Sequence, residues 1–249
     1  MQKEIRSNLI PKSHLNVSNS LVKQSNRYYI IKRWLDFVIA LVLLILLFPI
    51  MLLIALLIPL YDRGPIIFVQ ERNGAKRQVH AGNPSWKKVT FRCYKFRTMR
   101  VNSDSSVHQA YIKALIENDL ERIKNLQGET SEIRKLVHDS RITRPGHILR
   151  KLSLDELPQL WNVIRGDISL VGPRPAIPYE VEMYKPWHLK RLEAQPGLTG
   201  LQQVTARCTT AFDQQVQLDI EYVENQSLLL DIIIMLKTPL AVLSGKGAE

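Results

Sequence analysis

The sequence predicts a mainly helical α+β protein: a re-entrant membrane helix, followed by a domain with a short β-hairpin and amphipathic helices that lie on a surface. One long apolar segment near the N-terminus has a proline at its midpoint, and two alternating segments follow it. Most of the remaining chain shows apolar residues at helical spacing. We expect a tail at 1–28, the membrane helix at 29–61 and the domain at 62–249.

The apolar segment WLDFVIALVLLILLFPIMLLIALLIPLY runs from Trp34 to Tyr61, and Asp36 is its only charge. At about 1.5 Å per residue, a helix of this length exceeds the roughly 30 Å hydrocarbon core of a bilayer. Basic residues flank both ends, which favours placing both ends in the cytoplasm. Pro49 favours a kink. A hairpin-like re-entrant helix satisfies both observations, and a single kinked span with its N-terminal tail outside remains the alternative.

Two segments after the apolar run predict a hairpin. GPIIFVQERNG and VTFRCYKFRTM alternate apolar and polar residues and are rich in branched and aromatic types. A loop containing glycine, asparagine and proline joins them.

Helical spacing predicts the other elements. Residues 107–139 predict two amphipathic helices separated at Gly128, residues 148–164 predict another that stops at Gly166, and residues 179–194 predict a further one. Between the last two, VGPRPAIP is expected to be extended because residues before proline avoid the α region. The segment 227–243 is too interrupted to cross a bilayer, and it predicts either a helix on the membrane surface or one packed on the domain core.

The composition restricts the class of partner. A net charge of +11 and a pI near 9.7 point to an anionic partner such as phosphate, nucleic acid or an acidic membrane surface. Aromatic residues are sparse and no reading-helix or stacking motif occurs, so we expect no nucleic acid. Cys93 and Cys208 lack the spacing of a zinc site or a disulfide framework. No dinucleotide, Walker A, HExxH or GxSxG motif is present.

The stretch SLDELPQLWN places two carboxylates, Asp155 and Glu156, in an apolar run. Ser153 and Glu156 fit a capping box, whereas Pro158 fits the first turn of a helix that begins slightly later. Either register puts the carboxylates at a helix N-terminus, where anions are favoured. A purely structural role as helix caps remains open at this point.

Basic residues near this stretch favour a catalytic role for Asp155 and Glu156 over a role as helix caps. Arg150 precedes it, Arg174 is held between two prolines, and Arg207 follows the PGLTG turn. Lys95 and Arg97 are expected to share one face of a strand and to offer two cations to one anion. Two acids among so many cations suggest an anionic substrate, with a divalent metal between carboxylate and phosphate oxygens.

These segments together resemble the bacterial sugar transferases, the monotopic polyprenyl-phosphate phosphoglycosyl transferases. The similarity extends from Lys32 to Leu243 and rests on KRWLDFVIAL with its Pro49-broken helix, RGPIIFVQERNG, YKFRTM, DSRITRPGHILRKLSLDELPQLWNVIRGDISLVGPRP, QPGLTGLQQV and LDIEYVENQSLLLDIIIMLKTPLAV.

The resemblance implies a reaction and a place for it. A sugar-1-phosphate would pass from a nucleotide diphosphate sugar, expected to be a UDP-sugar, to a polyprenyl phosphate on the cytoplasmic face of the bacterial inner membrane. Asp155 would form a covalent phosphosugar intermediate, and Glu156 would help to hold Mg²⁺ or accept a proton. The expected substrate-binding residues are Lys95, Arg97, Arg150, Arg174, Arg207 and Asp219, with Asp155 and Glu156 as the metal ligands.

One further expectation and two rival interpretations remain. The long amphipathic helices and the position in one leaflet are compatible with a homodimer. A basic membrane-anchored scaffold that recruits acidic partners is one rival, because it uses the charge without the carboxylates. A phospholipid head-group transferase is the other, because it uses similar metal and carboxylate chemistry.

Overall fold

The structure is a computed structural model that describes residues 25–80, 83–101, 106–127, 141–205 and 211–244. Its elements follow in the order α2 (Asn26–Tyr61), β1 (Ile67–His80), β2 (Asn83–Phe96), α3 (Ser106–Glu117), α4 (Leu120–Gln127), α5 (Arg144–Lys151), the 3₁₀ turn η2 (Leu154–Glu156), α6 (Gln159–Arg165), β3 (Ser169–Val171), α7 (Pro178–Glu182), the 3₁₀ segment η3 (Pro186–Leu192), β4 (Gly197–Thr199), α8 (Leu201–Thr205), α9 (Phe212–Asn225) and α10 (Leu228–Leu243). The prediction of a mainly helical protein with an antiparallel hairpin is confirmed.

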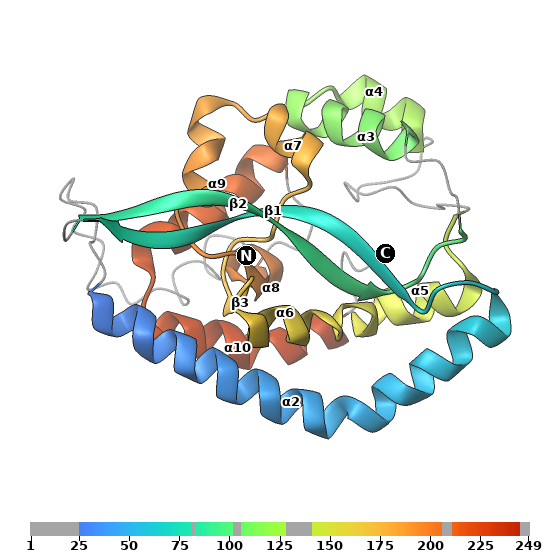
Figure 1. Cartoon of the computed structure of the whole chain (residues 1–249). Helices are drawn as coiled ribbons and strands as arrows, with labels where there is room; N and C mark the ends of the chain where they lie inside the picture. Colours follow the sequence, from blue (N-terminus) through green and yellow to red (C-terminus); the bar gives the residue numbers. More distant parts are fainter. Residues whose placement is uncertain (1–24, 81–82, 102–105, 128–140, 206–210, 245–249) are drawn as a thin grey trace.

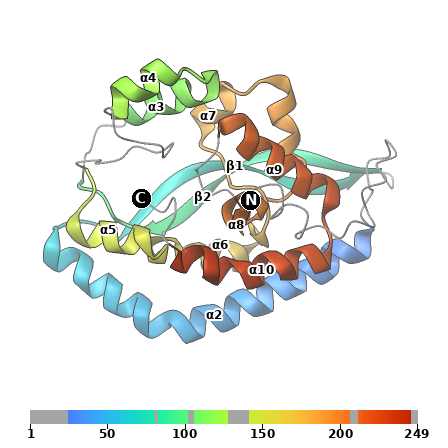
Figure 2. The ribbon, with the colours of Figure 1, turned by 180° about the vertical axis from the view of Figure 1, so that it is seen from behind.

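The twisted β1–β2 hairpin divides the molecule into two sides (Figure 1). Helices α3, α4 and α7 lie on one side, whereas α5, α6 and α10 lie on the other, between the hairpin and the long helix α2 (Figures 1 and 2). Helix α9 crosses the strands and leads from the first side to α10 (Figure 2). The main core lies between these layers and contains, among others, Cys93, Leu160, Val163, Tyr222 and Ile234.

The hairpin is longer than the sequence pattern predicts. Pairing runs from Ile67 opposite Phe96 to His80 opposite Asn83. The outer part of each strand carries charges such as Lys76 and Lys87, which lie opposite each other. Because these residues are exposed, they leave no alternation of apolar and polar residues to identify a strand.

Helix α2 is continuous through Pro49 and Pro59 and bends near its middle (Figure 1). In the part of the chain that the structure describes, it is a helix long and apolar enough to cross a membrane. Its buried residues recur every fourth position near the start, at Tyr28, Lys32, Asp36 and Ala40, and return only at Ile54 and Ile58. The two ends therefore pack on the same domain, while the middle arches away from it.

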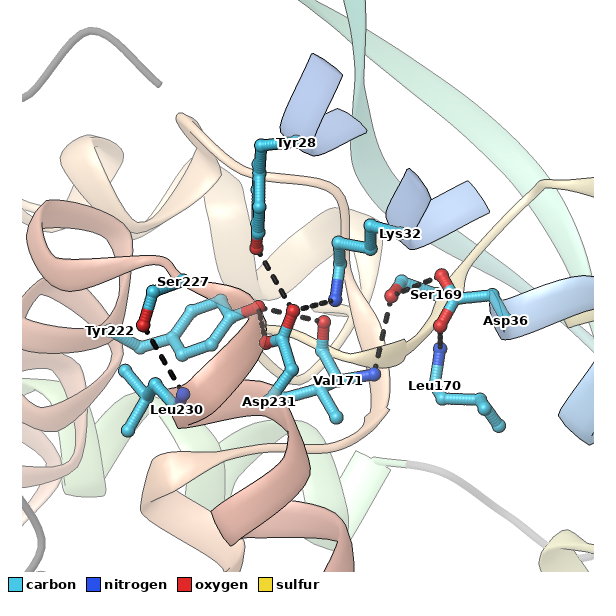
Figure 3. A network of polar contacts seen from close by, with 10 residues as sticks. All are labelled: Tyr28, Lys32, Asp36, Ser169, Leu170, Val171, Tyr222, Ser227, Leu230 and Asp231. Atoms are coloured by element: carbon cyan, nitrogen blue, oxygen red, sulfur yellow. Dashed lines mark hydrogen bonds and ion pairs between the residues drawn. The ribbon is translucent and has the colours of Figure 1, made fainter. Parts of the chain in front are cut away.

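A buried polar network fixes the first half of α2 to the domain (Figure 3). Lys32 Nζ lies 2.8 Å from Asp231 Oδ2, and the hydroxyl groups of Tyr28 and Tyr222 donate to the same carboxylate at 3.0 and 2.7 Å. One turn further along, Asp36 accepts hydrogen bonds from the Ser169 hydroxyl at 2.7 Å and from a backbone amide at 3.2 Å. The charges inside this apolar helix thus face the domain.

The second half of α2 is fixed by apolar contacts. Ile54 and Ile58 pack with Phe96 of β2 and Leu149 of α5 in a separate cluster. Most large apolar residues of the intervening segment, such as Leu46, remain exposed.

The predicted helix ends are correct only in part. The single helix predicted at 148–164 is wrong: Ser153 adopts φ of 54°, and the segment is divided among α5, η2 and α6. Gly166 ends α6 with φ at +77°, a left-handed conformation that favours glycine, as predicted. The expected single helix at 179–194 is wrong: α7 ends before Lys185, which is extended because it precedes Pro186, and η3 follows.

The helix expected to run from residue 107 to Gly128 is divided. Asn118 adopts φ of 57° between α3 and α4, and Asp119 caps α4 by accepting a hydrogen bond from the Arg122 amide at 3.0 Å. The second helix predicted in 107–139 lies outside the described residues.

Helix α10 packs on the domain core, one of the two alternatives left open for 227–243. Leu230, Asp231 and Ile234 are buried against the domain. On the opposite face, Leu236 and Leu240 are 71 and 70% exposed. One side of the helix therefore forms part of the core, and the other presents apolar residues to the surroundings.

Candidate functional site

The carboxylate pair lies in a tight turn between α5 and α6. Asp155 and Glu156 belong to the 3₁₀ turn η2, and α6 begins at Gln159 after Pro158. The capping box is wrong: Ser153 adopts φ of 54° and its side chain makes no cap hydrogen bond. The later register, marked by Pro158, is the one the chain adopts. Glu156 is therefore not needed to cap a helix.

Lys95 joins the end of β2 to both carboxylates. Its Nζ donates to Glu156 Oε1 at 2.6 Å and lies 4.0 Å from Asp155 Oδ2, beyond hydrogen-bond distance. Two segments about 60 residues apart in the sequence thus meet at one ammonium group. The structure brings these three predicted residues together.

The two neighbouring carboxylates differ in their electrostatic environment. Burial alone would raise the pKa of Glu156, but attraction to Lys95 and Arg174 outweighs it and lowers this pKa to about 2. Burial raises the pKa of Asp155, and the Glu156 charge adds to this effect, while Lys95 and Arg150 oppose it. Lys95 is therefore committed mainly to Glu156, and the Asp155 carboxylate is bound less tightly.

Two of the predicted arginines bring positive charge close to the Asp155–Glu156 pair. Arg150 donates through Nε to the Thr98 hydroxyl at 3.0 Å, and its charge acts on Asp155. Arg174 is exposed, and its charge acts on Glu156. A positive environment thus surrounds the carboxylates from α5, β2 and the segment after β3.

Arg97 does not share an anion with Lys95, contrary to the prediction. Strand β2 ends at Phe96, so the alternation of faces no longer applies to Arg97. Its buried guanidinium donates to the carbonyl oxygens of Asp62 and Arg63, and it forms an ion pair with Asp62 Oδ2 at 3.7 Å. Arg97 therefore fastens the end of α2 to the hairpin.

Asp219 is not brought to the carboxylate pair. It is 1% exposed and pairs with the buried Arg191, which also donates to the Arg174 carbonyl at 3.5 Å. Asp219 therefore holds Arg191 in place, and Arg191 in turn binds the backbone carbonyl of Arg174. Arg207, the remaining predicted cation, lies outside the described residues.

Sequence reasoning missed Arg72 on β1. This side chain is 8% exposed, and it donates to the Pro175 carbonyl at 3.0 Å and to Gln70 Oε1 at 2.7 Å. Burial lowers its pKa, and the Arg174 charge adds to that effect. Arg72 and Arg191 together hold the two carbonyl oxygens of Arg174 and Pro175, so they fix the segment that presents Arg174. The only signal in the sequence was an arginine within an alternating segment.

The carboxylate pair fits a magnesium ion that is shared with a phosphate ligand. Among the described residues, no group of three or more histidine, cysteine, aspartate or glutamate side chains could hold a metal by itself. Mg²⁺ commonly uses one or two carboxylates and takes its other ligands from water and substrate phosphates. Asp155 and Glu156 match that donor set.

Comparison with known proteins identifies the family. The model of the bacterial sugar transferase family matches residues 27–245. The chain is 42% identical over 234 residues to a UDP-galactose-lipid carrier transferase of Erwinia amylovora, covering 94% of this chain and 44% of that protein. It is 41% identical over 217 residues to the exopolysaccharide production protein ExoY of Sinorhizobium fredii, covering 87% of each. It is 39% identical to an undecaprenyl-phosphate galactose phosphotransferase of Salmonella typhimurium, covering 94% of this chain and 44% of that protein.

The chain thus spans less than half the length of two of these relatives and most of the third. The carboxylate pair, Lys95, Arg150 and Arg174 all lie within the matched residues. The resemblance predicted from the sequence motifs is confirmed: the chain belongs to the bacterial sugar transferase family.

Proposed function

We propose that this chain transfers a sugar-1-phosphate from a nucleotide diphosphate sugar to a polyprenyl phosphate, as a step in building a bacterial surface glycan. The observation that carries the proposal is the Lys95-bound carboxylate pair, with Arg150 and Arg174 beside it. The names of the Erwinia and Salmonella relatives support a UDP-sugar donor and an undecaprenyl phosphate acceptor.

Asp155 is the proposed nucleophile. An Asp155 carboxylate oxygen attacks the β-phosphorus of the donor, a new P–O bond forms, and the bond from that phosphorus to the bridging oxygen breaks. The nucleoside monophosphate leaves with the bridging oxygen and its electron pair. An oxygen of the polyprenyl phosphate then attacks the same phosphorus, and cleavage of the acyl phosphate restores the Asp155 carboxylate.

The cations make this attack possible. An anionic nucleophile approaches a diphosphate only where positive charge offsets the repulsion. Arg174 is exposed and its charge acts on Glu156, so we propose that it binds the diphosphate. Lys95 keeps Glu156 ionised, and Asp155 and Glu156 would hold Mg²⁺. That ion supplies charge neutralisation on the phosphate oxygens.

The proposal places the domain on the cytoplasmic face of the inner membrane, with α2 as a re-entrant helix. Both ends of α2 pack on one domain, through Lys32 and Asp36 at one end and Ile54 and Ile58 at the other, and this supports a re-entrant helix over a single kinked span with its N-terminal tail outside. The exposed apolar face of α10 would lie on the membrane surface.

A panel of donors tests the reaction. The full chain, purified in detergent, is incubated with polyprenyl phosphate and with UDP-galactose, other sugar nucleotides or a lipid nucleotide. We expect continuous monophosphate release, over many turnovers, only when both a sugar nucleotide and the polyprenyl phosphate are present. Release from the lipid nucleotide alone would instead support the head-group transferase, and no release from any donor would support the scaffold.

Replacing Arg72 tests whether the positive charge near the carboxylate pair contributes to the reaction. The Arg72→Gln variant loses the charged hydrogen bond to Pro175, so the segment that carries Arg174 is held less firmly. We expect kcat/KM to fall by about 10- to 100-fold, mainly through KM for the sugar nucleotide. Arg92, exposed on the neighbouring strand, is the matched control, and Arg92→Gln should change kcat/KM by less than about twofold. Equal effects in both variants would rule out a specific role for Arg72.

A further inference from the structure

A second basic region lies away from the carboxylate pair. A cavity of about 320 Å³ opens between the start of α2, the outer part of the hairpin and the end of α6. We call it the basic pocket. It is lined by the basic residues Lys32, Arg33, Lys76, Arg77 and Arg165, with the aromatic rings of Tyr29 and Trp86. None of the described residues in its lining carries a carboxylate. Its size is within the range of small-molecule sites.

The positive charge of the basic pocket is only partly compensated. Lys32 pairs with Asp231 at 2.8 Å. Lys76 and Arg165 share one carboxylate, that of Asp167, at 3.9 and 3.3 Å. Among the residues that the structure describes, these five cations form ion pairs with two carboxylates, and the Asp36 carboxylate also acts on Lys32.

Two of the cations have neutral partners. Arg33 donates to the carbonyl oxygens of Val163 and Ile164 at 2.6 Å each, which stabilises the end of α6. The Arg77 guanidinium lies 4.3 Å from the centre of the Tyr29 ring and donates to the Asn26 side chain at 2.6 Å. None of these partners carries a negative charge. Such an excess of positive charge around a concave surface attracts an anion.

The basic pocket and the carboxylate pair lie at opposite ends of α6. Asp155 precedes this helix, whereas Arg165 is its last residue. The cations proposed to bind the donor, Arg150 and Arg174, are absent from the pocket lining. The pocket is therefore separate from the site of the carboxylate pair.

The position of the pocket identifies the class of ligand. Tyr29, Lys32 and Arg33 stand immediately before the apolar run that starts at Trp34. The Tyr29 and Trp86 rings meet edge to face with centroids 5.9 Å apart. Tyrosine, tryptophan and basic residues concentrate where a bilayer meets water, and basic pockets at that level bind anionic head groups.

We propose that the basic pocket binds the phosphate head group of an anionic phospholipid. This inference rests on the membrane placement of α2 given in the proposed function, but not on the transfer reaction. The bound lipid fastens the start of α2 and the outer part of the hairpin to the membrane surface. Arg77 and Lys76 supply the hairpin's contribution to this site.

Titration of the full chain with dihexanoyl phosphatidylglycerol, below its micelle concentration, tests the proposal by calorimetry. Lys76→Gln/Arg77→Gln removes two charges from the pocket, and Lys87→Gln/Lys88→Gln removes two exposed charges from the paired strand outside it. We expect one lipid per chain, with affinity about tenfold or more weaker in the pocket variant and within about twofold in the control.

Three results would overturn the proposal. Equal weakening in both double variants would mean unspecific attraction to charge. Equal binding of dihexanoyl phosphatidylcholine by the unmodified chain would mean that the anionic head group is not recognised, and this measurement does not depend on any variant folding. Competition by inorganic phosphate at the same concentration as the lipid would assign the pocket to a soluble anion. Because no donor is present, failure here is distinct from failure of the transfer reaction.

Discussion

The Asp155→Asn variant is expected to lose monophosphate release by about 10⁴-fold or more, because an amide cannot form the acyl phosphate at an ordinary rate. Asparagine has nearly the same shape as aspartate, so the turn η2 and its packing should be retained. The measurement is release of nucleoside monophosphate from the sugar nucleotide, combined with mass analysis of the acid-quenched protein. The unmodified chain should carry a phosphosugar on Asp155 when the acceptor is withheld, and the variant should carry none.

A matched control separates chemistry from charge. Glu71 is exposed on β1, and Glu71→Gln removes one negative charge at a surface position. We expect turnover within about twofold of the unmodified chain for this control. Normal turnover of Asp155→Asn, or a phosphosugar adduct on that variant, would falsify the assignment of the nucleophile.

The Asp231→Asn variant should destabilise the fold more than any surface change. Asp231 is bound by Lys32 and by two tyrosine hydroxyl groups, and the side chains of the ion pair are only 9 and 6% exposed. Removing one member of a buried pair leaves an uncompensated charge and costs about 3–5 kcal/mol. Denaturant unfolding of the full chain in detergent measures this loss of free energy.

Two further variants serve as comparisons for that loss of unfolding free energy. Glu224→Gln breaks an exposed ion pair with Lys190. The side chains of Lys190 and Glu224 are 39 and 48% exposed, so this change should lower the free energy of unfolding by less than about 1 kcal/mol. Replacing both Lys32 with methionine and Asp231 with asparagine removes the unpaired charge and should recover part of the stability. If the double variant is no more stable than Asp231→Asn alone, the unpaired Lys32 charge is not what destabilises the single variant.

The sequence predicted the elements whose signals are local. The apolar length of α2, the alternation in the inner hairpin and the glycine at the end of α6 each depend on neighbouring residues alone. The carboxylate pair and Lys95 were predicted for the same reason, because each occurs in a short motif that resembles the family. The register of the turn was decided by Pro158, which leaves Ser153 outside any helix.

Other features depend on contacts between distant segments and could not be predicted from one sequence. The parallel β3–β4 pair consists of three residues per strand, too few for a periodic pattern. Arg72 acts by reaching a carbonyl oxygen about 100 residues away. In the sequence, Asp36 is an isolated charge within an apolar segment. In the structure it accepts a hydrogen bond from Ser169, which belongs to β3. In each case, the contact can be recognised only in the folded structure.

The attachment of α2 at both ends has a consequence for membranes of different composition. An ordinary spanning segment must match the thickness of its bilayer and tilts or distorts the lipid when it does not. In the proposed placement, the arch of α2 is set by its two attachments to the domain, so its depth of insertion depends on the protein and enters only one leaflet. Such an anchor avoids hydrophobic mismatch, and the enzyme should keep the same height above thin and thick bilayers alike.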